Sequence, residues 1–466
     1  MTDERAQGQA KFLTGNLLRH ITVMSLTSSV GLMAVFAVDF INMIFISMLG
    51  KAELAAAIGY AGAILFFTSS VGIGMAISAG SLVARALGAG DRVMAQQRAT
   101  NSLIYGVIVG AAFAAVVWFN LRPLATLLGA TGTTLDLTLN YLSIVIPSLP
   151  LLLVGMVGGA ILRAHGDAAR SMWATIGGAI VNAVLDPILI FGLHLDLTGA
   201  AISTVCARFA IAGIALLPLV RVYGGFGRPT LASVRLDLSP VLAIAVPAVM
   251  TQLATPVGQA FVTRAMSAYG EQAVAGMAII SRMTPMAFGV IFALSGAVGP
   301  IIGQNFGAGL FDRVKGAFRD GLIFTAIITV FVSLALFLLR GPLGLLFNLQ
   351  GDARTLVFLF AGPLSLLWFF NGVIFVGNAA YNNLGRPFYS TWVNWGRHTI
   401  GTVPLVVLGS LWFGAPGVLI GQSVGGVIFG LLSWWLALRV LTAAEGKVAA
   451  PIENELRVHR VMNNRL

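Results

Sequence analysis

The chain has little charge and almost no cysteine, and both shortages narrow the protein classes to which it can belong. Of its 466 residues only 10% are charged, while 58% are hydrophobic and the mean hydropathy is +0.91. A soluble protein of this length carries roughly 25% charged residues and divides into several domains. The single cysteine, Cys206, excludes an internal disulfide and is expected to be a small buried side chain in its apolar run.

Common enzyme signatures are also missing. No GxxxxGK[ST] loop occurs, so ATP is not the expected energy source. The polar N-terminus contains no short apolar core, so no cleavable signal peptide is expected. We predict that the protein is not an enzyme and that it holds no cofactor. The histidines are scattered without the spacing of metal ligands: His20, His165, His194, His398 and His459.

Long apolar runs recur instead along the whole chain. They reach about 20 residues or more, which is enough for helices to cross a hydrocarbon core of ~30 Å, and they do not alternate as the strands of a membrane barrel would. We predict an all-α integral membrane protein, multi-pass in the cytoplasmic (inner) membrane, with 12 transmembrane helices. The predicted spans are approximately 19–47, 54–84, 97–121, 136–162, 171–192, 199–221, 240–267, 273–304, 317–340, 355–382, 391–412 and 417–439.

Alternate loops differ strongly in their number of basic residues. With these spans, 20 Lys and Arg residues lie on one side of the membrane and five on the other, and Arg208, Arg282 and Arg397 fall inside spans. An excess of Lys and Arg in short loops marks the cytoplasmic side, so both termini are predicted to be cytoplasmic. The net charge of +11 is then explained by the basic residues of the cytoplasmic loops. No nucleic-acid partner is therefore expected.

The two halves of the chain are similar in sequence. The stretch "SLVARALGAGDRV" (81–93) matches "PIIGQNFGAGLFDRV" (300–314), and "HGDAARSMW" (165–173) matches "LGRPFYSTW" (384–392), both with a constant offset of 219 in residue number. One constant offset over this distance indicates a duplicated six-helix unit, and transporters built from such repeats hold their cavity between the halves. The predicted organisation is an N-terminal tail (1–18), an N-lobe (19–222), a cytoplasmic linker (223–239), a C-lobe (240–440) and a C-terminal tail (441–466).

Only two of the 17 acidic residues sit well inside apolar runs: Asp39 in "AVFAVDFINMIF" and Asp186 in "NAVLDPILIFG". An aspartate at mid-bilayer costs about 2.5–3.5 kcal/mol on insertion scales, so each requires a compensating role. The offset of 219 places Gly258 opposite Asp39 and Leu405 opposite Asp186, so the second copy lacks both acids. The ionisable chemistry is therefore predicted to lie in the N-terminal lobe.

Helical spacing adds partners to Asp186. Asn182 lies four residues before it, on the same helix face. Pro187 removes a backbone donor and is expected to kink the span as a hinge. Carboxylates, an amide oxygen and a freed carbonyl together predict a site for H⁺ or a small hard cation such as Na⁺.

These motifs resemble the multidrug and toxic compound extrusion (MATE) family, in its branch named for DNA-damage-inducible protein F. The likeness covers nearly all of residues 15–440 and includes "FAVDFINMIFISMLGKAELAA", "SLVARALGAGDR", "GQNFGAG", "LRAHGDAARSMW", "NAVLDPILIFG" and "TGAAISTV". The resemblance implies a cation-coupled (H⁺ or Na⁺) multidrug efflux antiporter that works by alternating access as a monomer. It further implies a cation site formed by Asp39, Asn182, Asp186 and Thr204, with Tyr141 as an adjoining hydrogen-bond partner.

The expected substrates are small, drug-like organic cations in a large, mostly apolar cavity between the lobes. The alternative is a flippase for lipid-linked saccharides, which would be expected to line its cavity with phosphate-binding arginines; only three basic residues fall inside spans here. Arg282 could pair with a carbonyl, reach toward the interface or repel cations. Adaptable Met and aromatic side chains are the candidate cavity lining: Met43, Met277, Met283, Met286, Phe288 and Phe292.

Overall fold

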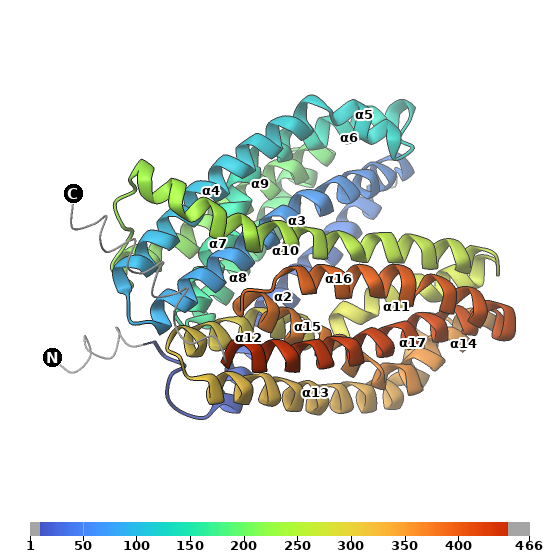
Figure 1. Ribbon diagram of the computed structural model, residues 1–466. Helices are drawn as coiled ribbons and strands as arrows, with labels where there is room; N and C mark the ends of the chain where they lie inside the picture. The colour runs from blue at the N-terminus through green and yellow to red at the C-terminus, as the bar shows by residue number, and fades with distance from the viewer. Residues whose placement is uncertain (1–9, 50, 446–466) are drawn as a thin grey trace. The chain divides into compact units, whose positions relative to one another are not determined.

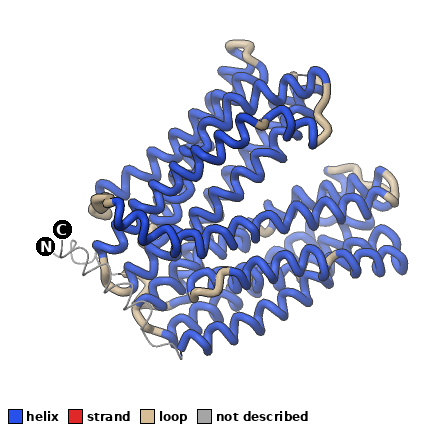
Figure 2. The backbone as a smooth tube through the Cα atoms, turned by 45° about the horizontal axis from the view of Figure 1, so that its top comes forward, coloured by secondary structure: helices blue, strands red, loops and turns tan. Residues whose placement is uncertain are grey.

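The computed structural model describes residues 10–49 and 51–445, and every regular element in this part of the chain is helical (Figures 1 and 2). Most of the two predicted tails, residues 1–9 and 446–466, lies outside the described residues. The helices of the first half are α2 (Leu17–Met48), α3 (Ala52–Gly88), α4 (Arg92–Phe119), α5 (Leu121–Leu127), α6 (Gly132–Val145), η1 (Ile146–Ser148), α7 (Leu149–Ala164), α8 (Ala168–Pro187), η2 (Ile188–Gly192) and α9 (Asp196–Arg221).

The second half continues the all-helical pattern after one short irregular segment. Its elements are α10 (Leu231–Ser267), α11 (Glu271–Ala287), α12 (Gly289–Gly307), α13 (Phe311–Leu346), α14 (Gly351–Leu359), η3 (Phe360–Leu364), α15 (Trp368–Asn383), α16 (Phe388–Gly396), η4 (Arg397–Gly401) and α17 (Val403–Glu445). Three of the short elements, η2, η3 and η4, are π-helical turns.

Ten of the described helical stretches are long and apolar enough to cross a membrane, or eleven if the bent pair Gly351–Leu364 and Trp368–Asn383 forms one span. The last stretch, Phe388–Glu445, contains both the eleventh and the twelfth predicted span. It turns back on itself at Gly414, where φ is 64°, and a Cβ added to Gly421 would lie 2.2 Å from the carbonyl oxygen of Leu405. Its two arms therefore pack against each other as separate spans, which explains why the count differs from twelve.

Packing divides the chain into two compact units. Among the described residues, unit 1 contains Val30–Val249 together with Lys11, and unit 2 contains Phe12–Ser29 together with the chain from Met250 to Glu445. The divisions fall inside α2 and α10, so each of these helices contributes to both units. The predicted lobes instead divide the chain at the linker between the sixth and seventh predicted spans. This division into lobes stays a prediction.

Polar contacts hold the start of α10 in unit 1. Asn101 donates to Asp237 at 2.6 Å, and Ser78 donates to the carbonyl of Val241 at 3.0 Å. Residues 231–239, which the charged sequence "LASVRLDLS" led us to predict as linker, are the first turns of this helix. Asp237, which lies within the predicted linker, is only 1% exposed inside this helix. Its charge faces Arg98 at 3.8 Å, and this pairing explains how an acid can be buried there.

The segment that leads into α2 is held in unit 2 in the same way. Phe12 is fully buried, and its backbone N–H donates to the side chain of Gln304 at 2.9 Å. Arg313 donates to the carbonyl of Phe12 at 2.9 Å. Each of these segments therefore docks on the repeat to which it does not belong in sequence.

The backbone repeats as the sequence motifs do. Four of the positions in the first repeat that have positive φ have a counterpart at the same offset of 219 that also has positive φ. All but one of the eight residues are glycine, which adopts this left-handed conformation at little cost. The duplication is thus present in backbone geometry. The pairs are Gly90 and Gly309, Gly129 and Asn348, Gly132 and Gly351, and Gly166 and Gly385.

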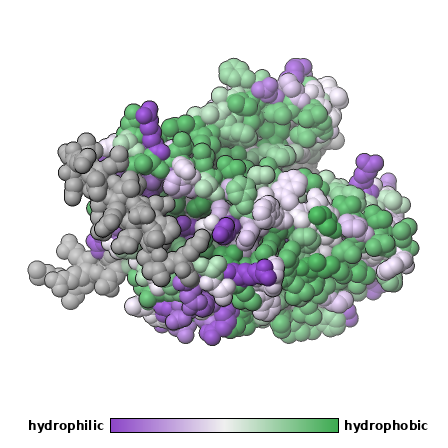
Figure 3. Space-filling model, in the orientation of Figure 1, coloured by the Kyte–Doolittle hydropathy of each residue, from purple (hydrophilic) through white to green (hydrophobic). Residues whose placement is uncertain are grey.

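The surface of the helices is largely apolar. On the face drawn in Figure 3, hydrophobic residues cover the long stretches of helix and hydrophilic residues gather toward their ends. Many large apolar side chains are exposed, such as Phe331 at 69% and Trp412 at 73%. An apolar exterior of this extent suits a lipid environment. Cys206 is half-buried rather than buried as expected.

Candidate functional site

Asp186 lies in the interior of unit 1 on the last turn of α8. Only 1% of the residue is exposed, and neither carboxyl oxygen has a hydrogen-bond partner of good geometry among the described residues. The helix passes from α to π geometry directly after Pro187. A buried carboxyl group without partners is costly unless it binds a proton or a cation. This residue is therefore the centre of the candidate site.

Asn182 lies one turn earlier on α8 and faces α9. The hydroxyl of Ser203 donates to its side-chain oxygen at 2.5 Å and approaches its backbone carbonyl at 3.3 Å. The same hydroxyl is close enough to the Asp186 carboxyl to influence it. Ser203 thus orients the amide oxygen and supplies a further oxygen beside the acid.

Tyr141 of α6 connects the remaining members of the predicted site. It is 8% exposed, its hydroxyl interacts with the side chain of Thr204 on α9, and it senses the charges of Arg208, Asp186 and Asp39. Thr204 also donates to the carbonyl of Ala200 at 2.9 Å. The structure therefore brings the predicted residues of three helices, α6, α8 and α9, together in one polar neighbourhood.

Asp39 is placed differently from Asp186. Its side chain is exposed on α2, and it approaches the site through Tyr141. No direct interaction joins the two carboxyl groups. Any coupling between them must pass through the surroundings of Tyr141 and not through a shared proton.

Sequence analysis missed two members of this neighbourhood. Ser203 precedes Thr204 and was overlooked because a serine in a span is not unusual. Arg208 was recognised inside a span but not assigned; its guanidinium group donates to the carbonyl of Val145 at 3.0 Å and to Ser148 at 2.9 Å. Its position one helical turn after Thr204 was the available signal. The charge of Arg208 acts on Tyr141, and this links the arginine to the same neighbourhood.

The candidate lining residues fall into two groups. Phe288 is fully buried and stacks on Trp368 at 4.8 Å, and Met277 is 5% exposed in the same apolar core of unit 2. Met283 packs against this core. Phe288 and Met277 do not face an open surface in this structure, and Met283 is half-buried. The exposed candidates are Met43 at 41%, Met286 at 52% and Phe292 at 36%.

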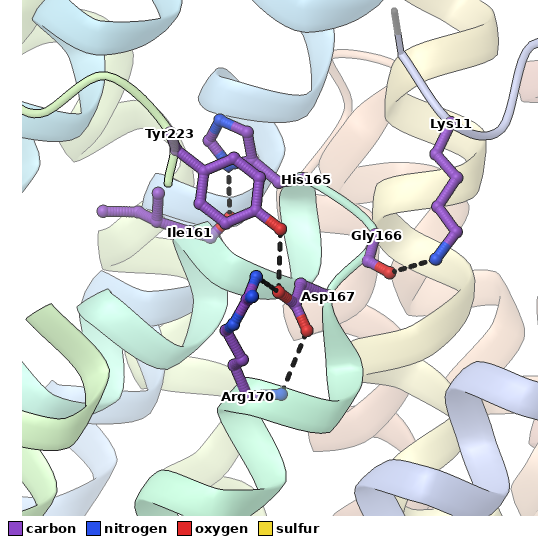
Figure 4. A network of polar contacts seen from close by, with 7 residues as sticks. All are labelled: Lys11, Ile161, His165, Gly166, Asp167, Arg170 and Tyr223. Atoms are coloured by element: carbon purple, nitrogen blue, oxygen red, sulfur yellow. Dashed lines mark hydrogen bonds and ion pairs between the residues drawn. The ribbon is translucent and has the colours of Figure 1, made fainter. Parts of the chain in front are cut away.

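A second polar network in unit 1 lies at the loop between α7 and α8 (Figure 4). Tyr223, which follows α9, donates to the Asp167 carboxylate at 2.7 Å, and Arg170 pairs with the same oxygen at 2.6 Å. Lys11 donates to the carbonyl of Gly166 at 2.9 Å. All of these charges have partners, so the network serves to hold chain segments together.

His165 is the titratable centre of this second network. Its ring lies 4.3 Å from that of Tyr223, between centroids, and its Nδ1 contacts the carbonyl of Ile161 at 2.9 Å. Burial lowers the pKa of His165 below 6.5, and the contacts with Ile161 and Asp167 oppose this effect only in part. The imidazole is therefore neutral at pH 7.

Comparison with known proteins supports both the fold and the duplication. The profile of the MatE family matches two stretches of the chain, residues 27–188 and 247–407. The starts of the two stretches differ by 220 in residue number (247 − 27) and their ends by 219 (407 − 188), close to the offset of the repeat.

Several characterised proteins are similar to the chain over nearly its whole length. The FAD transporter of Shewanella oneidensis is 28% identical over 94% of this chain and 98% of that protein. The multidrug export protein MepA of Staphylococcus haemolyticus is 24% identical over 95% of this chain and 98% of that protein. Among solved structures, a point mutant of the Vibrio cholerae MATE transporter VcmN aligns with a TM-score of 0.88 and 23% identity over 92% of this chain and 99% of that chain.

Proposed function

We propose that this chain, which belongs to the MatE family of transporters, is a cation-coupled antiporter whose coupling ion binds at Asp39 and Asp186. The observation that carries the proposal is the carboxyl group of Asp186, 1% exposed and without a hydrogen-bond partner of good geometry among the described residues. A proton or Na⁺ would relieve this unfavourable burial. Asn182, Ser203, Thr204 and Tyr141 offer neutral oxygens around the ion.

The mechanism follows from differential affinity. In one state the site takes up H⁺ or Na⁺, its net negative charge falls, and a bound organic cation is released. In the other state the ion leaves, and the re-ionised carboxylates favour binding of the next cation. Each ligand shifts the equilibrium only by as much as it prefers one state. Asp39, exposed on α2, is the acid that a substrate would reach first.

The proposed substrates are small organic cations of the drug type. The name of the relative MepA points to drugs, and the name of the Shewanella relative points to FAD. The negative charges of the unit 1 site favour cations. We further propose a monomer in the cytoplasmic (inner) membrane with both termini in the cytoplasm, as the distribution of basic residues predicts.

Vesicles that contain the purified protein test this proposal. Uptake of a fluorescent organic cation is measured under a pH gradient alone and under a Na⁺ gradient alone, with FAD as a competitor. Uptake under one gradient identifies the coupling ion. Uptake that neither gradient drives would overturn the proposal, and strong competition by FAD would move the substrate class away from simple cations.

A further inference from the structure

Unit 2 contains an arginine in a candidate membrane span that has no partner among the described residues. Arg397 is half-buried at the start of η4, and no described residue forms an ion pair or hydrogen bond with its guanidinium group. It lies nine residues after Phe388, the start of α16, which corresponds to about 14 Å along a candidate membrane span. An arginine inside a membrane span is costly unless an anion or a ring of carbonyls compensates it.

No described acid of unit 2 is placed to neutralise Arg397. The described acids of this unit are Glu271, Asp312, Asp320, Asp352 and Glu445, and none of them lies in α15, α16 or η4. Asp320 pairs with its neighbour Arg319 at 3.0 Å. In unit 1, by contrast, Arg208 donates to the carbonyl of Val145 and to the hydroxyl of Ser148. The charge of Arg397 is therefore uncompensated within the described chain.

His398 stands next to Arg397 and is also unsatisfied. It is 3% exposed, and its Nδ1 is buried without a hydrogen-bond partner in the described part of the chain. The ring packs against α10 at Gly258, where an added Cβ would lie 2.2 Å from this nitrogen. Only glycine leaves room for the imidazole there.

The backbone at this point is irregular, because Pro404, three residues after η4, has no N–H to donate to the carbonyl of Ile400. The π-turns η2 and η3 likewise adjoin or contain proline, at Pro187 and Pro363. π-Turns inside α-helices are frequent at functional sites. The equivalent residues of the first repeat, 178–182, continue a regular α-helix. The irregular turn, the unpaired guanidinium and the unsatisfied imidazole thus coincide, among the described residues, in unit 2 alone.

We propose that Arg397 and His398 form a recognition site for an oxyanion, the carboxylate or phosphate of a transported compound. A planar guanidinium binds two oxygens of such a group at once, and an imidazole N–H can donate to it. The inference rests on the proposed transport function and narrows its substrates to amphoteric organic compounds, which carry an acidic group besides a cationic one.

A matched pair of dyes tests the site. Rhodamine B has a free carboxylate, and its ethyl ester is otherwise the same cation. Binding of both to the purified full-length protein is measured by fluorescence anisotropy without any ion gradient. The wild-type protein is expected to bind the free carboxylate about tenfold or more tightly, since a charge-assisted hydrogen bond contributes roughly 1.5–3 kcal/mol.

Variants show which residue causes the preference for the dye with the free carboxylate. Arg397→Gln should abolish it and leave ester binding unchanged, Arg397→Lys should keep part of it, and Arg282→Gln, which alters an exposed arginine of unit 2, should preserve it. If Arg397→Gln does not fold, Arg397→Lys and His398→Gln still report through the ratio of the two affinities. A wild-type protein without preference, or an Arg397→Gln variant that keeps it, would overturn the assignment. Because no gradient is used, loss of coupled uptake alone would refute the transport proposal and leave this one standing.

Discussion

Asp39 of unit 1 and Gly258 of unit 2 occupy matching positions in the two repeats (39 + 219), and their surroundings differ in charge. Around the first, α6, α8 and α9 bring together carboxyl, amide and hydroxyl oxygens. Against the second packs the imidazole of His398, beside an arginine without a partner among the described residues. The repeats share left-handed turns at four matching positions, while their ionisable side chains differ. Backbone geometry is preserved because every helix depends on it, whereas one side chain can change alone.

The largest expected effect concerns the acid of unit 1. Asp186→Asn should reduce gradient-driven uptake by roughly 5- to 150-fold, the usual range of a coupling free energy. The protein should stay folded with an undiminished melting temperature, because asparagine has the same shape and removes a buried charge that has no hydrogen-bond partner in the described chain. Asp136→Asn is the matched control, since its side chain is 73% exposed. If Asp186→Asn took up the substrate as fast as the wild-type protein, ion coupling would not distinguish unit 1 from unit 2.

The glycine of unit 2 should be irreplaceable for a steric reason. Gly258→Ala would place a Cβ 2.2 Å from Nδ1 and 2.8 Å from Cβ of His398, so the ring must shift. We expect a loss of about 1–3 kcal/mol in the free energy of unfolding, measured by thermal unfolding in detergent. Gly213→Ala on α9, with nothing within 4 Å, should instead be neutral or stabilising by about 0.5–1 kcal/mol. Equal effects of both substitutions would contradict the close packing of His398.

A smaller effect is expected where a hydroxyl supports the cation site. Ser203→Ala removes the donor at 2.5 Å from the Asn182 side chain, a loss of about 0.5–1.5 kcal/mol. Half-maximal uptake should then require a several-fold higher concentration of the coupling ion. Ser423→Ala in unit 2, at the position that matches Thr204 (204 + 219), is the control, because its hydroxyl bonds only to the carbonyl of Leu419 among the described residues. An unchanged ion dependence in Ser203→Ala would remove that residue from the site.

The smallest effect is the contribution of His165 in unit 1 to the pH dependence of stability. Because the folded pKa of His165 lies below the unfolded value of 6.5, the unfolded chain binds the proton more readily. The contribution of His165 to stability is therefore complete above pH 6.5 and is lost as the pH falls below that value. Leu384 occupies the matching position of the second repeat (165 + 219) and cannot titrate.

The comparison of melting temperatures at pH 8 and pH 5 measures this effect. His165→Gln should show a smaller decrease between the two pH values than the wild-type protein. An identical decrease in both proteins would assign the pH dependence to other groups.

Much of the architecture could be predicted because it depends on local properties of the sequence. The length of apolar runs gave the spans, the constant offset of motifs gave the duplication, and two acids in apolar surroundings marked Asp39 and Asp186. The π-turn after Pro187 follows from a missing backbone donor. Each of these features is decided within a few turns of one helix or by direct comparison of two stretches.

Only the tertiary structure decided which helices share which surroundings. Composition cannot show that the starts of α2 and α10 dock on opposite units, because Phe12 meets Gln304 and Asn101 meets Asp237 across long stretches of chain. The same holds for the burial of Asp186 against the exposure of Asp39, and for His398 against Gly258. Hydropathy records the cost of placing a residue in the membrane. Whether that cost is offset depends on neighbours that are distant in sequence, and these are determined only when the helices pack.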